Sequence, residues 1–242
     1  MGASLLISVP PLVLFARKMS RVAALEASLA ERLNASAALS AAGQPLVLAL
    51  GSVTVARDSQ EANAAIAVLL DRSVALAQST VGTRSESRVR AAFYDFDEAG
   101  LRRRAYCVYA GSDAPRRNFI VGRTAHEDEV IRFANGENAI LVRDLENEPP
   151  PHFVDSRGRN YKSFISVPVR AGNSSFGLLT VDADRPFALD EADRAYVVLI
   201  AGVLGAGLAH AEVVAHEKTK RTPDSHVSRS RQDSTSSKRS ST

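Results

Sequence analysis

Few residues in this sequence have the type and spacing that chemistry requires. His126-Glu-Asp-Glu129 places an imidazole and three carboxylates within four positions, a set that could bind a metal or transfer protons. The same residues follow Thr124 and begin an apolar-patterned stretch, and carboxylates in the first turn of a helix interact favourably with its dipole. We therefore interpret them as the start of a helix and expect no metal site.

The sequence has one cysteine, Cys107, which excludes an internal disulfide and any mechanism that needs a resolving cysteine in the same chain. Its neighbours predict a strand, so we expect it to be a small buried hydrophobe, with a redox role as the alternative. Asp144 follows an apolar strand and could contact a ligand or bond the next turn. A phosphate-binding Gly-rich loop, a Gly-x-Ser-x-Gly elbow and a His-Glu-x-x-His motif are all absent from the sequence. We expect a protein that is not an enzyme.

The distribution of charge separates the body of the chain from its tail. The chain has 242 residues, 45% of them hydrophobic, and a formal net charge of +3. Residues 216–242 carry +4 of that charge and are rich in Ser and Thr, so the rest of the chain is close to −1. This tail is predicted to be disordered, and the folded body is not expected to bind nucleic acid.

The N-terminal segment, residues 1–18, is apolar up to Ala16 and contains Pro10-Pro11. Its apolar part is shorter than the roughly 20 residues that a membrane-spanning helix needs. Two interpretations remain open: contact with a membrane surface, or an apolar segment without a membrane. We expect a cytoplasmic protein, with membrane association through this segment as the alternative. Residues 19–58 are predicted to form a helical stalk, because apolar residues recur in Met19–Leu39 at helical spacing. That stripe is equally consistent with a coiled coil and with a helix packed on its own domain.

The predicted elements of residues 59–215 place hairpins between helices. Asp58 begins a helix over residues 60–80, residues 88–109 alternate as a hairpin, and a short helix ends at Asn135-Gly136. A strand at 139–142, a second hairpin over 161–182 and a helix from Glu191 to about Ala215 follow. This order predicts an α+β fold, an antiparallel sheet with the N- and C-terminal helices on one face. Residues 111–160 would then cover the other face and enclose a small-molecule cavity.

The last helix is rich in small residues, with Gly202, Gly205, Ala206, Gly207 and Ala209. Small residues lower helix propensity and are explained where another element approaches closely. The helix is apolar around most of its circumference, so we expect it to form a homodimer as well as to pack on the sheet.

Residues from about 60 to 212 resemble a GAF domain. The resemblance rests on Tyr161-Lys-Ser163, Val167-Pro-Val169, Gly177-Leu-Leu-Thr-Val-Asp182, Arg185-Pro186 and Leu189-Asp-Glu-Ala-Asp193. Gly136–Asp144 is similar to the middle strand of the family. The resemblance implies an antiparallel sheet with a small-molecule pocket, a sensory or regulatory role, and dimerisation through the end helices. The cyclic-nucleotide signature Asn-Lys-x-Phe-Asp-Glu is absent from this sequence, and the cofactor is unknown.

We therefore expect a non-catalytic sensory or regulatory module that binds a small molecule or a protein partner and signals through its end helices as a dimer. A small cysteine-dependent redox enzyme and a dimerisation scaffold without a pocket are the alternatives. The candidate ligand-binding residues are Phe93, His126, Asp144, Phe164 and Ser166.

Overall fold

The computed structural model describes residues 43–151 and 160–221. The predictions for residues 1–42, which include the N-terminal segment and most of the stalk, and for the tail beyond residue 221 lie outside the described residues. Residues 43–54 are helical, as the sequence favoured, and Leu46, Ala49 and Val53 are buried.

A six-stranded antiparallel sheet forms the centre of the fold, with the strand order β3-β2-β1-β6-β5-β4. The two long hairpins were predicted and are confirmed, whereas no strand was predicted at the position of β3. A strand of three residues is too short to show an alternating pattern, so nothing in the sequence distinguished it. The strands are β1 (Val89–Asp97), β2 (Gly100–Cys107), β3 (Asn118–Ile120), β4 (Ile140–Val142), β5 (Ser163–Ala171) and β6 (Ser174–Ala183).

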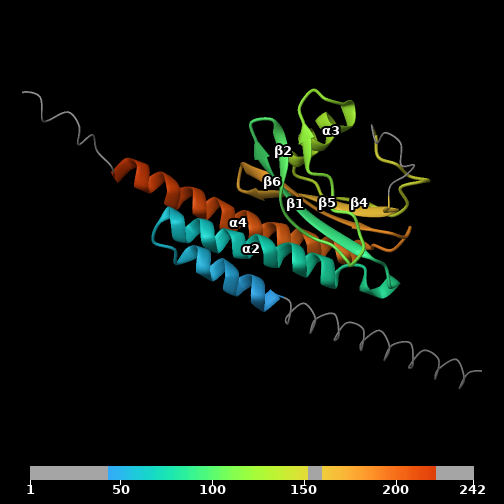
Figure 1. Cartoon of the computed structure of the whole chain (residues 1–242), viewed down its shortest axis with the longest axis horizontal. Coiled ribbons are helices and arrows are strands. Elements are labelled where there is room, and N and C mark those ends of the chain that lie inside the picture. The colour runs from blue at the N-terminus through green and yellow to red at the C-terminus, as the bar shows by residue number, and fades with distance from the viewer. Residues whose placement is uncertain (1–42, 152–159, 222–242) are drawn as a thin grey trace, which may run out of the picture. The chain divides into compact units, whose positions relative to one another are not determined.

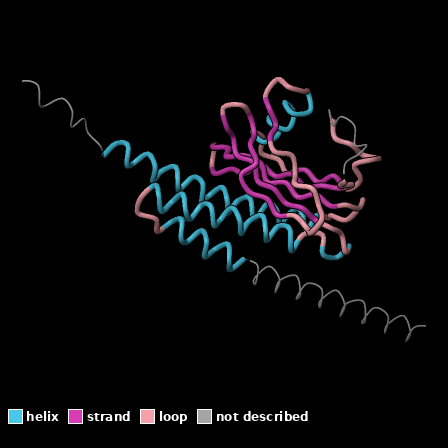
Figure 2. The backbone as a smooth tube through the Cα atoms, viewed as in Figure 1, coloured by secondary structure: helices cyan, strands magenta, loops and turns pink. Residues whose placement is uncertain are grey.

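Two long helices, α2 (Ser59–Thr80) and α4 (Glu191–Arg221), lie side by side on one face of the sheet (Figure 1). The third helix, α3 (Ala125–Ala134), lies with its flanking loops on the opposite face (Figure 2). The prediction of end helices on one face and a loop-rich cover on the other is therefore confirmed.

Strand alternation assigns each side chain to one of the two faces. In β1 the side chains of Val89, Ala91 and Phe93 join the core beneath α2 and α4, and those of β5 and β6 do so at alternate positions. The residues of the sheet and of the two helices that face each other here are almost all aliphatic, so the main hydrophobic core lies between them. A smaller cluster, which includes Ala92 and Tyr94, lies on the other face beneath α3.

Side-chain caps fix where each helix begins. The Asp58 carboxylate accepts hydrogen bonds from the N–H groups of Gln60 (2.8 Å) and Glu61 (2.9 Å). At the start of α4, Asp190 accepts from the Asp193 N–H (2.9 Å), and the Asp193 carboxylate accepts in return from the Asp190 N–H (3.0 Å). These reciprocal bonds satisfy N–H groups that a helix start leaves unpaired.

The small residues of α4 have separate explanations. A Cβ at Gly205 would overlap the backbone of Arg170 in β5, and one at Gly207 would meet the Leu69 side chain of α2. Gly202, by contrast, has no neighbour within 4 Å of such a Cβ. Two of these glycines therefore serve packing within the domain, and Gly202 lies on an open part of the helix.

Residues Glu191–His216 of α4 are long and apolar enough to cross a membrane, judged by length and composition alone. A core helix passes the same test, and α4 packs against α2, β5 and β6. The described helix also extends beyond Ala215, where the sequence suggested its end, to Arg221.

Candidate functional site

A cavity of about 460 Å³ lies between the second face of the sheet, α3, residues 113–119, Pro150 and Pro151, and Asn160 and Tyr161. Its size is within the range of roughly 300–1,000 Å³ that is typical of small-molecule sites. The strand residues that line it come from alternate positions, because the intervening positions face the helix layer.

The floor of the cavity consists of rows of residues that lie opposite one another across neighbouring strands. One row runs Arg90, Asp182 and Phe164, and the next runs Ala92, Thr180, Ser166 and Ile140. A third row contains Tyr94, Leu178 and Pro168. The floor therefore has a charged row at one end, a row with two hydroxyls in the middle, and an apolar row at the other end.

One face of α3 forms a wall of the cavity. His126, Glu129, Val130 and Phe133 line it, at the spacing of 3, 4 and 7 residues that keeps side chains on one side of a helix. His126 is buried and its ring lies edge-on to Phe119, with the centroids 6.3 Å apart. The helix position is fixed by Thr124, whose hydroxyl accepts from the Glu127 N–H at 3.2 Å.

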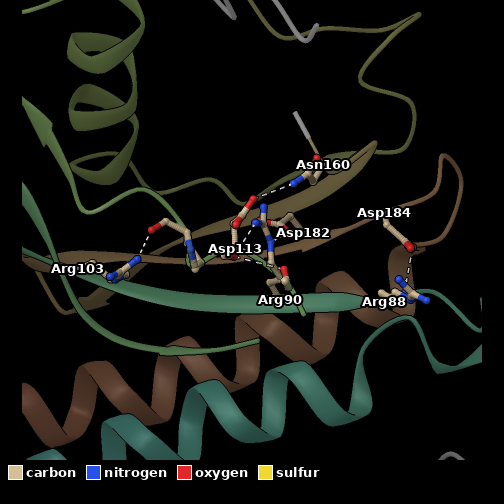
Figure 3. Close-up of polar contacts among 9 residues, drawn as sticks. Arg88, Arg90, Arg103, Asp113, Asn160, Asp182 and Asp184 are labelled. Atoms are coloured by element: carbon tan, nitrogen blue, oxygen red, sulfur yellow. Dashed lines mark hydrogen bonds and ion pairs between the residues drawn. The ribbon is translucent and has the colours of Figure 1, made fainter. Parts of the chain in front are cut away.

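A buried ion pair occupies the charged end of the floor. Arg90 Nε and Nη2 donate to the two carboxylate oxygens of Asp182 at 2.7 and 3.0 Å, with only 9% and 15% of the two side chains exposed. Arg90 also donates to the Asp113 carbonyl (3.1 Å), and its guanidinium lies 5.6 Å from the centre of the Tyr161 ring. Figure 3 shows Asn160 beside this group, where its amide donates to the Asp113 carboxylate at 3.2 Å. The ion pair between β1 and β6 is therefore linked to Asp113, and through Asp113 to Asn160, at two borders of the cavity.

Burial changes the protonation behaviour of the ion pair. It raises the pKa of Asp182 above its ordinary value, and the hydrogen bonds and charge of Arg90 act in the opposite direction. Removing the Arg90 charge would therefore raise the pKa of Asp182 further.

Glu127 does not line the cavity, but it holds together the elements that cover it. This carboxylate is 1% exposed, and it accepts from Arg116 (3.1 Å), Arg123 Nε (2.8 Å) and the Ile120 N–H (2.7 Å). Desolvation of Glu127 opposes its ionisation, but the arginines and the backbone N–H outweigh it and lower its pKa. The sequence predicted this residue in the first turn of a helix, where it lies, and its side chain also ties the start of α3 to β3 and the preceding loop.

Tyr94 lies at the apolar end of the cavity floor. Its ring lies edge-on to Phe119, with the centroids 5.2 Å apart, and its hydroxyl donates to the Arg116 carbonyl at 2.9 Å. Burial raises the pKa of this phenol well above its ordinary value, so the hydroxyl stays protonated.

Three of the five candidate residues line the cavity: His126 from α3, and Phe164 and Ser166 from β5. Two do not. Phe93 was assigned to the wrong face, because odd-numbered positions of β1 face the helix core and even-numbered positions face the cavity. Asp144 accepts from the Glu146 and Asn147 N–H groups (3.1 and 3.3 Å) and the Asn147 amide (2.7 Å). That carboxylate stabilises a turn, and the Asn147 bond is the main cause of its lowered pKa.

The sequence interpretation missed Arg90, Tyr94, Asp113, Thr180 and Asp182. The sequence did contain a signal for Arg90 and Tyr94. The odd-numbered positions of this strand, Val89, Ala91 and Phe93, are all apolar, whereas the even-numbered positions include Arg90. The apolar set had to face the helices, which leaves Arg90 and Tyr94 for the cavity.

Cys107 lies on the helix face of the sheet, half-buried, with its Sγ 3.9 Å from the Gln78 side-chain oxygen. The sheet therefore separates it from the cavity. Within the described residues there is no group of three or more His, Cys, Asp or Glu side chains that could hold a metal ion.

Comparisons with known proteins agree with this geometry. A family model described as GAF domain matches residues 35–209. Free methionine-R-sulfoxide reductase from Neisseria meningitidis, solved in complex with its substrate, is 19% identical, with 72% of this chain and 92% of that chain covered and a TM-score of 0.50. The blue-light absorbing form of the PixJ GAF domain from Thermosynechococcus elongatus is 16% identical, with 66% of this chain and 92% of that chain covered and a TM-score of 0.50. At such identities the likeness shows the fold alone. A search of curated proteins finds no match to this sequence.

Proposed function

The chain belongs to the GAF domain family, and from this premise we propose that it is a non-catalytic sensory or regulatory module that binds a small molecule in the cavity. Domains of this family are sensory and ligand-binding modules. The observation that carries the proposal is the cavity itself, which is of ligand size and lies on the sheet face opposite the end helices. It argues against a scaffold without a pocket.

The polar groups that line the cavity support a binding role more than a catalytic one. Arg90 and Asp182 neutralise each other, and the Tyr94 hydroxyl is held protonated by burial. The thiol of Cys107 lies on the other side of the sheet, so the alternative of a cysteine-dependent enzyme cannot use this cavity.

The end helices offer a route for the signal. Both α2 and α4 pack directly on the strands that form the cavity floor. Expansion or closure of the cavity would move β1, β5 and β6, and therefore α2, which rests on β1, and α4, which rests on β5 and β6. We propose that these helices carry the signal as a homodimer, or pass it to a protein partner.

Exposed aliphatic residues of α2 and α4 are candidates for the interface of the proposed dimer. Val198 and Leu199 of α4 and Val68 of α2 are 44%, 54% and 48% exposed, and Gly202 leaves room for a close approach. A contiguous patch of exposed aliphatic groups marks a surface that a partner covers, and we propose that these residues belong to one such patch. The membrane contact proposed for residues 1–18 concerns residues outside the described part of the chain.

A charge in the middle of this surface should prevent dimerisation. For Leu199→Glu we expect a monomer where the unmodified chain is a dimer, measured by light scattering coupled to size-exclusion chromatography. Val121→Glu, at an exposed valine that is not on these helices, is the matched control and should leave the dimer intact. A monomeric unmodified chain, or a Leu199→Glu variant that still dimerises, would reject this interface.

Native mass spectrometry of the purified full chain tests the proposed function as a whole. It reports the subunit number and any retained small molecule in one spectrum. We expect a dimer that carries a bound mass of metabolite size. A monomer without such a mass, after exposure to cell extract, would contradict the proposal.

A further inference from the structure

Two hydroxyl groups in the middle of the cavity floor have no hydrogen-bond partner within the described part of the chain. They belong to Ser166 of β5 and Thr180 of β6, which lie directly opposite each other and both line the cavity. Neither oxygen is among the fully enclosed unpaired side-chain atoms, so both open onto the cavity. Residues opposite each other in an antiparallel pair have Cβ atoms about 5 Å apart, so one ligand atom can reach both hydroxyls.

The surroundings of this hydroxyl pair are apolar. In the same row Ala92 lies on one side and Ile140 on the other. The next row contains Tyr94 and Leu178, which belong to the smaller hydrophobic cluster under α3. A ligand in this part of the cavity therefore meets one pair of hydrogen-bonding groups within a mainly hydrocarbon wall.

Most charged side chains of the lining already have a charged partner. Arg90 is paired with Asp182, and the half-exposed Arg116 donates to the buried Glu127, which it shares with Arg123. On the α3 wall, Glu129 accepts from Arg132 Nε at 3.0 Å.

Asp113 is the remaining charged group of the wall. It is exposed to solvent and accepts from the Asn160 amide. The wall thus presents no arginine or carboxylate, among the residues described, that needs a charged ligand as its partner.

From these observations we propose that the ligand of the cavity is an electrically neutral, mainly apolar compound whose single carbonyl or hydroxyl group bonds Ser166 and Thr180. This inference rests on the proposed function and specifies its ligand class. A carbonyl oxygen accepts from both hydroxyls, and a ligand hydroxyl accepts from one and donates to the other, so either group satisfies the pair. A ligand with a net charge would lose its hydration without gaining a free counter-ion, which makes its burial unfavourable.

A set of four matched probes tests this ligand class on the full chain. 4-Phenylbutan-2-one is neutral and carries a carbonyl, 3-phenylpropanoate is an anion, 3-phenylpropylammonium is a cation, and butylbenzene has no polar group. Methyl NMR titrations that follow Ile140 and Leu178 report binding in this cavity, since both side chains line it. We expect the ketone to bind most tightly of the four.

Removal of the hydroxyls tests the assigned residues. In the double variant Ser166→Ala with Thr180→Val, the affinity for the ketone should fall about fivefold to a hundredfold, the loss expected for two neutral hydrogen bonds. The affinity for butylbenzene should stay the same, which also shows that the variant has kept its fold. The two single variants should give intermediate losses.

Two outcomes would overturn the inference alone: tighter binding of the anion or the cation than of the ketone, or an unchanged ketone affinity in the double variant. A lack of shifts at Ile140 and Leu178 with all four probes would overturn both the inference and the proposed ligand cavity. The two failures are therefore distinguishable.

Discussion

Loss of the Arg90 side chain should destabilise the protein in a way that depends on pH. The variant Arg90→Met removes both hydrogen bonds to Asp182 and the bond to the Asp113 carbonyl but keeps much of the side-chain volume. Removing one partner of a buried ion pair costs roughly 3–5 kcal/mol. Because both side chains keep some access to the cavity, we expect the low end, about 3 kcal/mol at pH 7.5, or a fall in Tm of about 6–12 °C.

The pH dependence follows from the carboxylate that is left behind. Burial already raises the pKa of Asp182 in the folded state, and only Arg90 opposes that change. In Arg90→Met the pKa rises further, so the folded variant binds a proton at a pH where the unfolded chain does not. Stability that depends on this proton is present below the unfolded pKa and is lost as the pH rises through the folded pKa. The variant should therefore recover part of its deficit between pH 7.5 and pH 5.

A double-mutant cycle with urea unfolding, followed by far-ultraviolet circular dichroism, measures the effect. The variant Arg90→Met with Asp182→Leu replaces the pair with apolar side chains and should lie within about 1 kcal/mol of the unmodified protein, since no unpaired charge remains. The reasoning is refuted if Arg90→Met costs less than about 1 kcal/mol at pH 7.5, if its deficit is the same at pH 5, or if the double variant loses the sum of the two single variants.

The remaining predictions concern the cover and the sheet. Glu127→Gln should cost about 1–3 kcal/mol at pH 7, because a buried acceptor of three donors loses its charge. Because the pKa of Glu127 is lowered, the stability that its charge contributes is present above the unfolded pKa and is lost as the pH falls through the folded pKa. The difference in unfolding free energy between Glu127→Gln and the unmodified protein should therefore disappear near pH 3. An equal difference at pH 3 and pH 7, or an equal loss in the exposed control Glu137→Gln, would contradict this. Gly177 has φ +139° and a Cβ there would overlap the Tyr94 carbonyl oxygen, so Gly177→Ala should cost about 3 kcal/mol or more in urea unfolding. Gly172→Ala, in an open turn with φ +56°, should cost only about 1–2 kcal/mol, and equal losses in the two variants would show that the overlap is not the cause.

The order and type of most elements could be predicted because they depend on local signals. Asp58 and Asp190 mark helix starts through side-chain oxygens that reach N–H groups two and three residues away. The Gly172-Asn173 turn and the alternation of its flanking residues identify the second hairpin without information from the rest of the chain.

The candidate site depends on register, and register is not local. Arg90 and Asp182 are 92 positions apart and meet only because β1 pairs with β6 at one alignment. A shift of one residue exchanges the faces of a strand, which is the error made for Phe93. The prediction that Asp144 contacts a ligand was wrong for another reason. A carboxylate at the end of a strand can accept a hydrogen bond from its own turn or from a ligand, and only the structure shows which groups surround it.

Equilibrium dialysis of the full chain against deproteinised cell extract, with the retained compounds identified by mass spectrometry, tests the central claim most directly. The unmodified protein should concentrate a neutral small molecule. Ser166→Phe, whose ring would occupy the cavity, should lose it, and Val121→Phe, at an exposed position away from the cavity, should retain it. A compound that is enriched equally by all three proteins, or by none of them, would contradict a ligand-binding cavity on this face of the sheet.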